Sequence, residues 1–190
     1  RNDTIVITAT LKAKDFIEDY QKKVRRFPLA MNATLTDLGN QTKTLIKKEI
    51  KNEWNIKDKD LNKNFKLVKS FSTSPKRIQF YGIGRGIGIR VFAAKVSSKP
   101  VKTDSGKYRY VIKAKIKKSG SQELISGAFG LRGKNKSILA RKTTERFPLR
   151  KVYGPGLAVM FNDDIKNKAI TFVKFKFPII FDNKVKFFYD

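Results

Sequence analysis

Residues 127–161 read GAFGLRGKNKSILARKTTERFPLRKVYGPGLAVMF, and the rest of the chain is organised around this stretch. It opens on Gly-Ala-Phe, continues with a strand-like segment at 137–141, and then crosses a charged segment that includes Lys142 and Glu145. A Pro-broken apolar piece at 147–149 and a Tyr-Gly-Pro-Gly turn at 153–156 follow. The stretch carries no catalytic group, and we interpret it as a rigid connector that makes contacts.

Net charge and composition define the first limits on function. The 190 residues carry 43 Lys+Arg against 16 Asp+Glu, a formal net charge of +27. Such a surplus favours polyanions, anionic membranes or an acidic protein as partners. The alternative is the compositional bias of a Lys- and Asn-rich chain, and the sequence leaves both explanations open. A hydrophobic content of 40% with fifteen Phe indicates a folded protein with a core.

Several kinds of chemistry are excluded by residue type. The chain has no Cys and no His, so it lacks thiol nucleophiles, the commonest general base and the commonest metal ligand. The acidic pairs Asp58/Asp60 and Asp163/Asp164 stand where helices are expected to start, which favours roles in capping and at the helix dipole. We therefore predict that the protein is not an enzyme and binds no metal and no cofactor. Since no apolar run approaches the ~20 residues that span a bilayer, we expect a soluble protein made inside the cell, without a membrane partner.

Apolar residues at three- and four-residue steps predict helices at 14–26, 29–54 and 58–62. The longest has an apolar stripe that we interpret as core-facing, although it could also meet a neighbouring subunit. Its members are Met31, Leu35, Leu38, Thr42, Leu45, Ile46, Ile50 and Trp54. A C-terminal helix is expected within 156–177, ending before Pro178, with a strand at 169–177 as the alternative. For residues 179–190 we expect a hairpin or a strand that docks on another subunit.

Alternation and β-branched residues predict strands at 4–10, 65–71, 77–81 and 87–96. Glycine occupies every even position from 82 to 88. This spacing, without a strand-to-helix context, does not match a phosphate-binding loop. It indicates a close approach of two backbones, or a bulge.

A two-faced segment follows, with aromatic and apolar residues on one side. These are Tyr108, Tyr110, Ile112, Ala114 and Ile116. The basic side chains Arg109, Lys113, Lys115 and Lys117 alternate with them. We predict a basic β-hairpin arm at 95–118, whose basic residues are candidates for contact with DNA or an acidic partner. The alternative is a solvated outer face.

These elements predict an α+β fold. N-terminal helices, including one long amphipathic helix, pack on an antiparallel β-sheet, and a C-terminal helix completes the structure. With no internal repeat and no interior linker, residues 1–190 are predicted to form a single domain.

The central stretch resembles the minor tail protein Z family of long-tailed bacteriophages, the lambda-type tail completion proteins. The matching residues are Gly127-Ala128-Phe129, Ala140-Arg141, the run RFPLRKVYGPG at 146–156, and Met160-Phe161. The family's segment has an Arg, then Arg-hydrophobic-Pro, then a hydrophobic-Tyr-Gly-Pro-Ser turn before the final helix. Gly156 stands where the family usually has Ser, a change expected to loosen the turn without altering its direction. Residues 27–29 and 54–61 extend the resemblance weakly.

The resemblance implies a structural virion protein at the head-proximal end of the tail, or neck, that is present in the host cytoplasm during assembly. It would complete the tail, help to join it to the head and help to position the DNA. Its implied partners are further copies in a ring, expected to be a hexamer, tail terminator and tail tube proteins, head-completion proteins and the viral DNA end.

On that model Arg141, Arg146, Arg150 and Tyr153 are candidates for subunit or ring-to-ring contacts. Pro148, Gly154 and Pro155 would fix the turn. Purely intramolecular roles are the alternative for each of these residues. The alternative function is a basic nucleic-acid-binding protein without catalytic activity, and a weaker third interpretation is an enzyme that acts on nucleic acid.

Overall fold

The computed structural model describes residues 4–9, 27–72, 76–97, 99–102, 106, 108–125, 127–130, 138–141 and 147–189. The α+β class predicted from the sequence is confirmed, with a long N-terminal helix, antiparallel sheets and a C-terminal helix. Residue contacts divide the chain into two compact units. The single domain predicted for residues 1–190 stays a prediction, and each unit is described separately below.

One unit joins two long helices to a three-stranded sheet. It comprises Thr4–Glu49, Asn64–Ile83 and Phe161–Asp190. Its elements are β1 (Thr4–Ala9), α2 (Phe27–Glu53, counted in this unit up to Glu49), β2 (Phe65–Ser70), β3 (Arg77–Ile83) and α5 (Asp163–Tyr189). The sheet has the order β1-β3-β2 and is antiparallel throughout. These elements confirm the strands predicted at 4–10, 65–71 and 77–81 and the helix predicted at 29–54.

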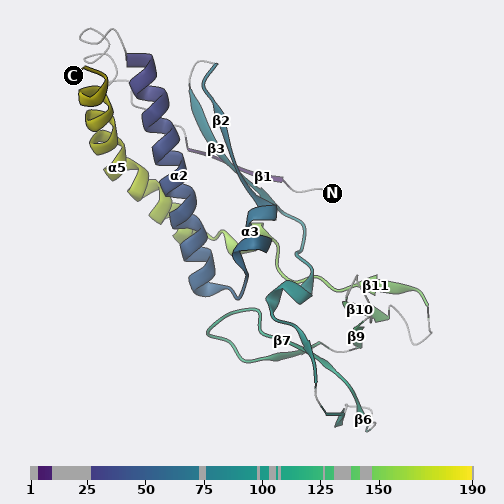
Figure 1. Cartoon of the computed structure of the whole chain (residues 1–190). Coiled ribbons are helices and arrows are strands. Elements are labelled where there is room, and N and C mark those ends of the chain that lie inside the picture. Colours follow the sequence, from purple (N-terminus) through teal and green to yellow (C-terminus); the bar gives the residue numbers. More distant parts are fainter. Residues whose placement is uncertain are drawn as a thin grey trace. The chain divides into compact units, whose positions relative to one another are not determined.

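Helix α2 lies between α5 and the sheet in this unit (Figure 1). On the sheet side, Gly39 permits close packing, because a Cβ there would come within 3.1 Å of the Ile78 side chain. On the other side, α2 and α5 run antiparallel. Ion pairs join Asp37 to Lys184 at 2.7 Å and Glu49 to Lys168 at 2.9 Å. The apolar stripe of α2 thus faces this unit's core, with Leu38 and Ile46 almost fully buried.

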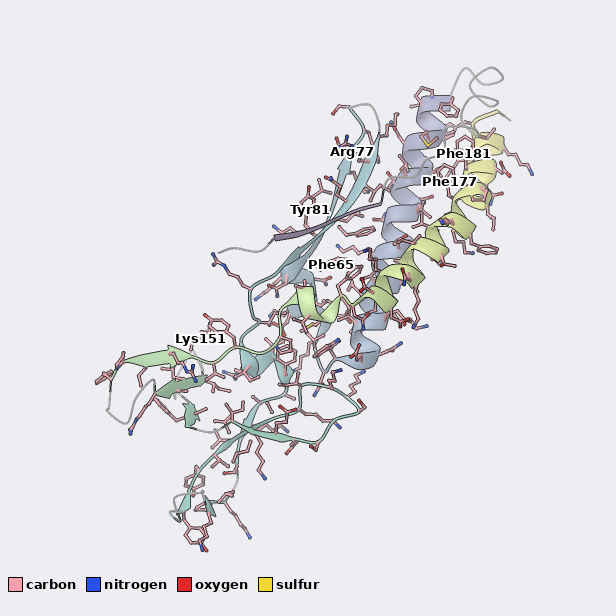
Figure 2. The ribbon with its side chains drawn as sticks, turned by 180° about the vertical axis from the view of Figure 1, so that it is seen from behind. Phe65, Arg77, Tyr81, Lys151, Phe177 and Phe181 are labelled. Atoms are coloured by element: carbon pink, nitrogen blue, oxygen red, sulfur yellow. The ribbon has the colours of Figure 1, made fainter. Side chains whose placement is uncertain are left out.

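Helix α5 continues through Pro178 to Tyr189, so the predicted stop before Pro178 is wrong, and so is the hairpin or strand at 179–190. Proline removes one backbone hydrogen bond and is costly inside a helix. Packing outweighs this cost, because Phe177 and Phe181 stack at 5.8 Å (Figure 2). Phe181 also meets Phe27 edge-on at 5.7 Å. Both α5 rings are buried.

The other unit contains the remaining strands and three short helical elements. Its described part lies within Ile50–Lys63 and Gly84–Met160. The helical elements are α3 (Asp58–Asn64), η1 (Ile89–Phe92, a 3₁₀ turn) and α4 (Leu157–Met160). The strands are β4 (Lys95–Val96), β5 (Val101–Lys102), β6 (Tyr108–Arg109), β7 (Ile112–Ala114), β8 (Glu123–Ile125), β9 (Ala128–Gly130), β10 (Ile138–Arg141) and β11 (Leu149–Lys151). They form sheets of order β4-β7-β8 and β11-β10-β9 and a β5-β6 pair.

The strand predicted at 87–96 is wrong for most of its length. Residues 89–92 form η1, in which Val91 donates to the Gly88 carbonyl at 3.0 Å, and only Lys95–Val96 is extended. One 3₁₀ turn brings residues three apart onto the same side. Ile89 and Phe92 are both buried in consequence, whereas a strand would have pointed them to opposite faces. The helix predicted at 14–26 lies outside the described residues.

Candidate functional site

The glycine-rich segment packs on the Tyr-Gly-Pro-Gly turn, backbone against backbone. The Gly154 amide donates to the Ile87 carbonyl at 2.7 Å, and the Ile87 amide donates to the Pro155 carbonyl at 3.3 Å. One step further on, the Ile89 amide donates to the Val152 carbonyl at 3.2 Å. Two segments far apart in the sequence thus form a short ladder that holds the turn in place.

Glycine is required at the points of closest approach. A Cβ at Gly86 would lie 2.8 Å from the Gly154 carbonyl oxygen, and one at Gly154 would lie 2.7 Å from the ring of Phe92, which is fully buried. A Cβ at Gly156 would overlap the Gly84 carbonyl oxygen. The close backbone approach predicted from the alternating glycines is therefore present, and it is made with this chain's own turn.

Gly156 corrects one expectation drawn from the resemblance. A glycine in place of the family's serine was expected to loosen the turn. Here Gly156 is buried, and a Cβ would meet the Gly84 carbonyl and also the Arg85 carbonyl at 2.8 Å. The glycine permits tight backbone packing in this protein, and a serine would not fit without movement of the facing segment.

The remaining predicted turn residue, Pro148, stands immediately before β11. The Phe147–Pro148 peptide bond is cis, and β11 begins at the next residue, Leu149. The Val152 amide, just beyond β11, donates to the Ile138 carbonyl of β10 at 3.0 Å. The chain is thus held on β10 from Leu149, just after Pro148, to Val152 at the start of the turn.

The structure places the predicted contact arginines on different faces of their sheet. Strand pairing sets Arg141 opposite Leu149 and Ala140 opposite Arg150. Because directly paired residues share a face and neighbours along a strand alternate, Arg141 and Arg150 point to opposite sides. Both are exposed. Arg146 lies outside the described residues.

Lys151 belongs with Arg141 and Tyr153, and sequence reasoning missed it. It pairs with Leu139 and so shares the face of Arg141. Its ammonium lies 5.6 Å from the centre of the Tyr153 ring, a cation–π distance, and it projects from β11 (Figure 2). We name Arg141, Lys151 and Tyr153 the Tyr153 surface. The period-two spacing of residues 149, 151 and 153 was the signal that could have found Lys151.

The Tyr153 surface is open to solvent and stands on a turn that is held in place. Tyr153 is 57% exposed, and Arg141 and Lys151 are exposed. The turn beneath them is fixed by the ladder to residues 87–89 and by Gly156, which is buried. An aromatic ring and two cations on a rigid support suit contact with a carboxylate-bearing or otherwise anionic partner.

The hairpin residues predicted to contact DNA have different local environments. Lys113 lies directly opposite Lys95 in the β4–β7 pair. Lys117 is already engaged, at 2.8 Å from Glu53 and 4.9 Å from the centre of the Trp54 ring. The backbone of Lys115 bonds to Phe92 and Asn55. Arg109 pairs through its backbone with Val101.

Within the described ranges, no three Asp or Glu residues gather as a metal-binding group would require. In that same part of the chain, no helix has both the length and the apolar character needed to cross a bilayer. Comparison of the chain with protein-family models, curated proteins and solved structures found no match.

Proposed function

We propose that this chain is a structural virion protein of a long-tailed bacteriophage. It completes the head-proximal end of the tail, helps to join tail and head, and helps to position the DNA. It acts without catalysis, as a ring of copies, expected to be a hexamer, between tail and head-completion proteins in the neck. The resemblance of residues 127–161 to tail completion proteins supports the proposal.

One observation carries it: the turn within the resembling stretch is fixed by backbone bonds and glycine contacts while Tyr153 stays 57% exposed. Holding an aromatic side chain in solvent on an ordered turn suits a contact surface, since preorganised groups lose less entropy on binding. In this proposal the Tyr153 surface meets a neighbouring copy or the adjoining ring, and Arg150 serves a contact on the opposite face.

The test is complementation in the phage that encodes the chain. A phage lacking the gene is supplied with wild-type protein or with a Lys151→Ala/Tyr153→Ala double variant. We expect the variant to accumulate filled heads and separate tails in electron micrographs, with few infectious particles. Phe187→Ala, which removes an exposed ring from α5, is the control and should restore the normal yield. A normal yield from the double variant would refute the contact role of the Tyr153 surface.

A second candidate function, nucleic-acid binding without catalysis, is favoured by the Lys95–Lys113 pair. Like charges directly opposite each other on antiparallel strands are destabilising, and a chain of net charge +27 offers few acids to offset them. A polyanion would relieve this repulsion. Both functions can hold for one protein, because a neck ring surrounds the path of the DNA.

A further inference from the structure

The hairpin formed by β4 to β7 has an anchored base. The Ser97 amide donates to the Val111 carbonyl at 2.8 Å, and the Val111 amide donates to the Ser97 hydroxyl oxygen at 3.0 Å. At the other end of β7, the Lys115 amide donates to the Phe92 carbonyl at 3.2 Å, and the Asn55 side chain donates to the Lys115 carbonyl at 3.1 Å. The base is therefore part of the core of its unit.

The hairpin is buried at its base and exposed toward its tip. Ile112 and Ala114, on one face of β7, are each only 1% exposed, whereas Tyr110 is 61% and Tyr108 is 71% exposed. Tyr108 belongs to β6, and Tyr110 lies in the short link between β6 and β7. In Figure 1, β6 lies at the far end of this hairpin, beyond β7. Two aromatic rings close together in the sequence are thus exposed to solvent toward the tip.

Lysines accompany these rings. Lys102 lies directly opposite Tyr108 in the β5–β6 pair, and Lys99 is exposed in the segment that leads into β5. The Lys95–Lys113 pair lies closer to the base. Exposed rings beside cations match surfaces that bind single-stranded nucleic acid, where bases stack on aromatic side chains and cations follow the phosphates.

Charge argues against the two other occupants of the tip. A second copy of this chain also carries +27, so contact between tips would bring like charges together. An acidic protein would satisfy the lysines but gives no particular role to two exposed rings. Duplex DNA would be held by its phosphates, since its stacked bases are not available to the rings.

We propose that Tyr108 and Tyr110 form a stacking platform for single-stranded nucleic acid, with Lys102 and Lys99 at its phosphates. The proposal rests on the second candidate function above and is independent of the Tyr153 surface. The net positive charge alone would favour any polyanion. The proposal assigns binding to one site and predicts a preference for single-stranded over double-stranded nucleic acid.

The test measures binding of a fluorescent oligothymidylate and of a duplex of the same total charge to the full chain, at one low salt concentration. The Tyr108→Ala/Tyr110→Ala variant should lose at least about fivefold in affinity for the single strand, the lower limit for one stacked base. Its affinity for the duplex should change little. Tyr108→Phe/Tyr110→Phe keeps the rings and should bind the single strand as the wild type does, and circular dichroism verifies the fold of each variant.

Phe175→Ala is the matched control, because it also removes an exposed ring beside a lysine, and its affinity for the single strand should be unchanged. Equal binding by the alanine double variant and the wild type would overturn the platform, as would an equal loss in Phe175→Ala. Displacement of the oligonucleotide by polyglutamate at matched charge would assign the tip to an acidic protein instead. Failure of the wild type to bind either nucleic acid would overturn the second candidate function as well, and leave the proposed virion role untouched.

Discussion

Gly156 faces the carbonyl oxygen of Gly84 so closely that the two segments have no space for a Cβ between them. The contact is between backbones, so neither side can yield by rotating a side chain. We predict that Gly156→Ala lowers the free energy of unfolding by about 1–3 kcal/mol, the usual cost of overpacking. Urea denaturation followed by circular dichroism measures it.

Gly88→Ala is the control from the same glycine run. There the nearest atom to an added Cβ is the end of the flexible Lys151 side chain, at 3.8 Å. We expect little change in stability. If both substitutions have equal cost, the backbone contact is not the reason for glycine at 156.

A second prediction concerns the part of α5 that follows Pro178. Phe181→Ala removes a ring that is 1% exposed and meets Phe27 and Phe177. We expect a loss of about 3–5 kcal/mol, as for other buried aromatic truncations. Phe187→Ala, at a position 74% exposed, should leave the melting temperature nearly unchanged. A negligible effect of Phe181→Ala would show that the helix beyond Pro178 does not pack as described.

A third prediction concerns the contribution of Lys168 to stability and its loss at alkaline pH. Hydrogen bonds to Glu49 and then Asp164 raise the pKa of Lys168 above the ordinary lysine value. Because the folded pKa exceeds the unfolded one, the stabilisation is fully present below the unfolded pKa of about 10.4 and is lost as pH rises through the folded pKa. Lys168→Met should therefore lower the melting temperature at about pH 8 and have no effect once the lysine is neutral in both states.

The exposed Lys166 supplies the comparison, because Lys166→Met makes the same chemical change two residues away. The pH dependence of its melting temperature should follow that of the wild type. A melting-temperature difference between Lys168→Met and the wild type that persists above the raised pKa would contradict an electrostatic origin.

A fourth prediction separates stability from binding at the Lys95–Lys113 pair. Lys113→Glu replaces a like-charge cross-strand pair with an opposite-charge one, and should stabilise the fold by about 0.2–1 kcal/mol. The same change should weaken duplex binding at low salt and reduce its salt dependence, because it removes a phosphate contact. Thermal melts and fluorescence anisotropy measure the two effects.

Lys166→Glu is the control, because it makes the same change of charge on α5, outside the hairpin. A loss of duplex affinity as large as that of Lys113→Glu would mean that overall charge, and not the hairpin, determines binding. Retention of full duplex affinity by Lys113→Glu would argue against nucleic acid as the partner of this face.

Local sequence patterns predicted most of the elements whose structure is determined by residues close to them in the sequence. The apolar steps of α2 and the alternation of β2 and β3 are of this kind. The extent of α5 depended on Phe27, which lies more than a hundred residues earlier and packs on Phe181 beyond the proline. A rule about proline contains no information on such a partner.

In the candidate site, too, some features were predictable from local sequence and others depended on distant residues. The turn at 153–156 and the close backbone approach of the glycine run followed from residue type. The opposite orientation of Arg141 and Arg150 depends on the register of β10 and β11, which is fixed by pairing and cannot be counted along one strand. Lys151 was missed although the period-two spacing along its own strand places it on the side of Tyr153.

The contact between the glycine run and the turn also has an evolutionary consequence. A side chain at position 86 would meet the turn at 153–154, and one at 156 would meet the carbonyl groups of residues 84 and 85, although these segments are far apart in the chain. A homologue with serine at 156 must draw back the backbone at 84–85, and one with a larger residue at 86 must move the turn. Positions 86 and 156 should therefore change together or not at all, and such covariation could mark relatives of this protein whose other residues have diverged beyond similarity.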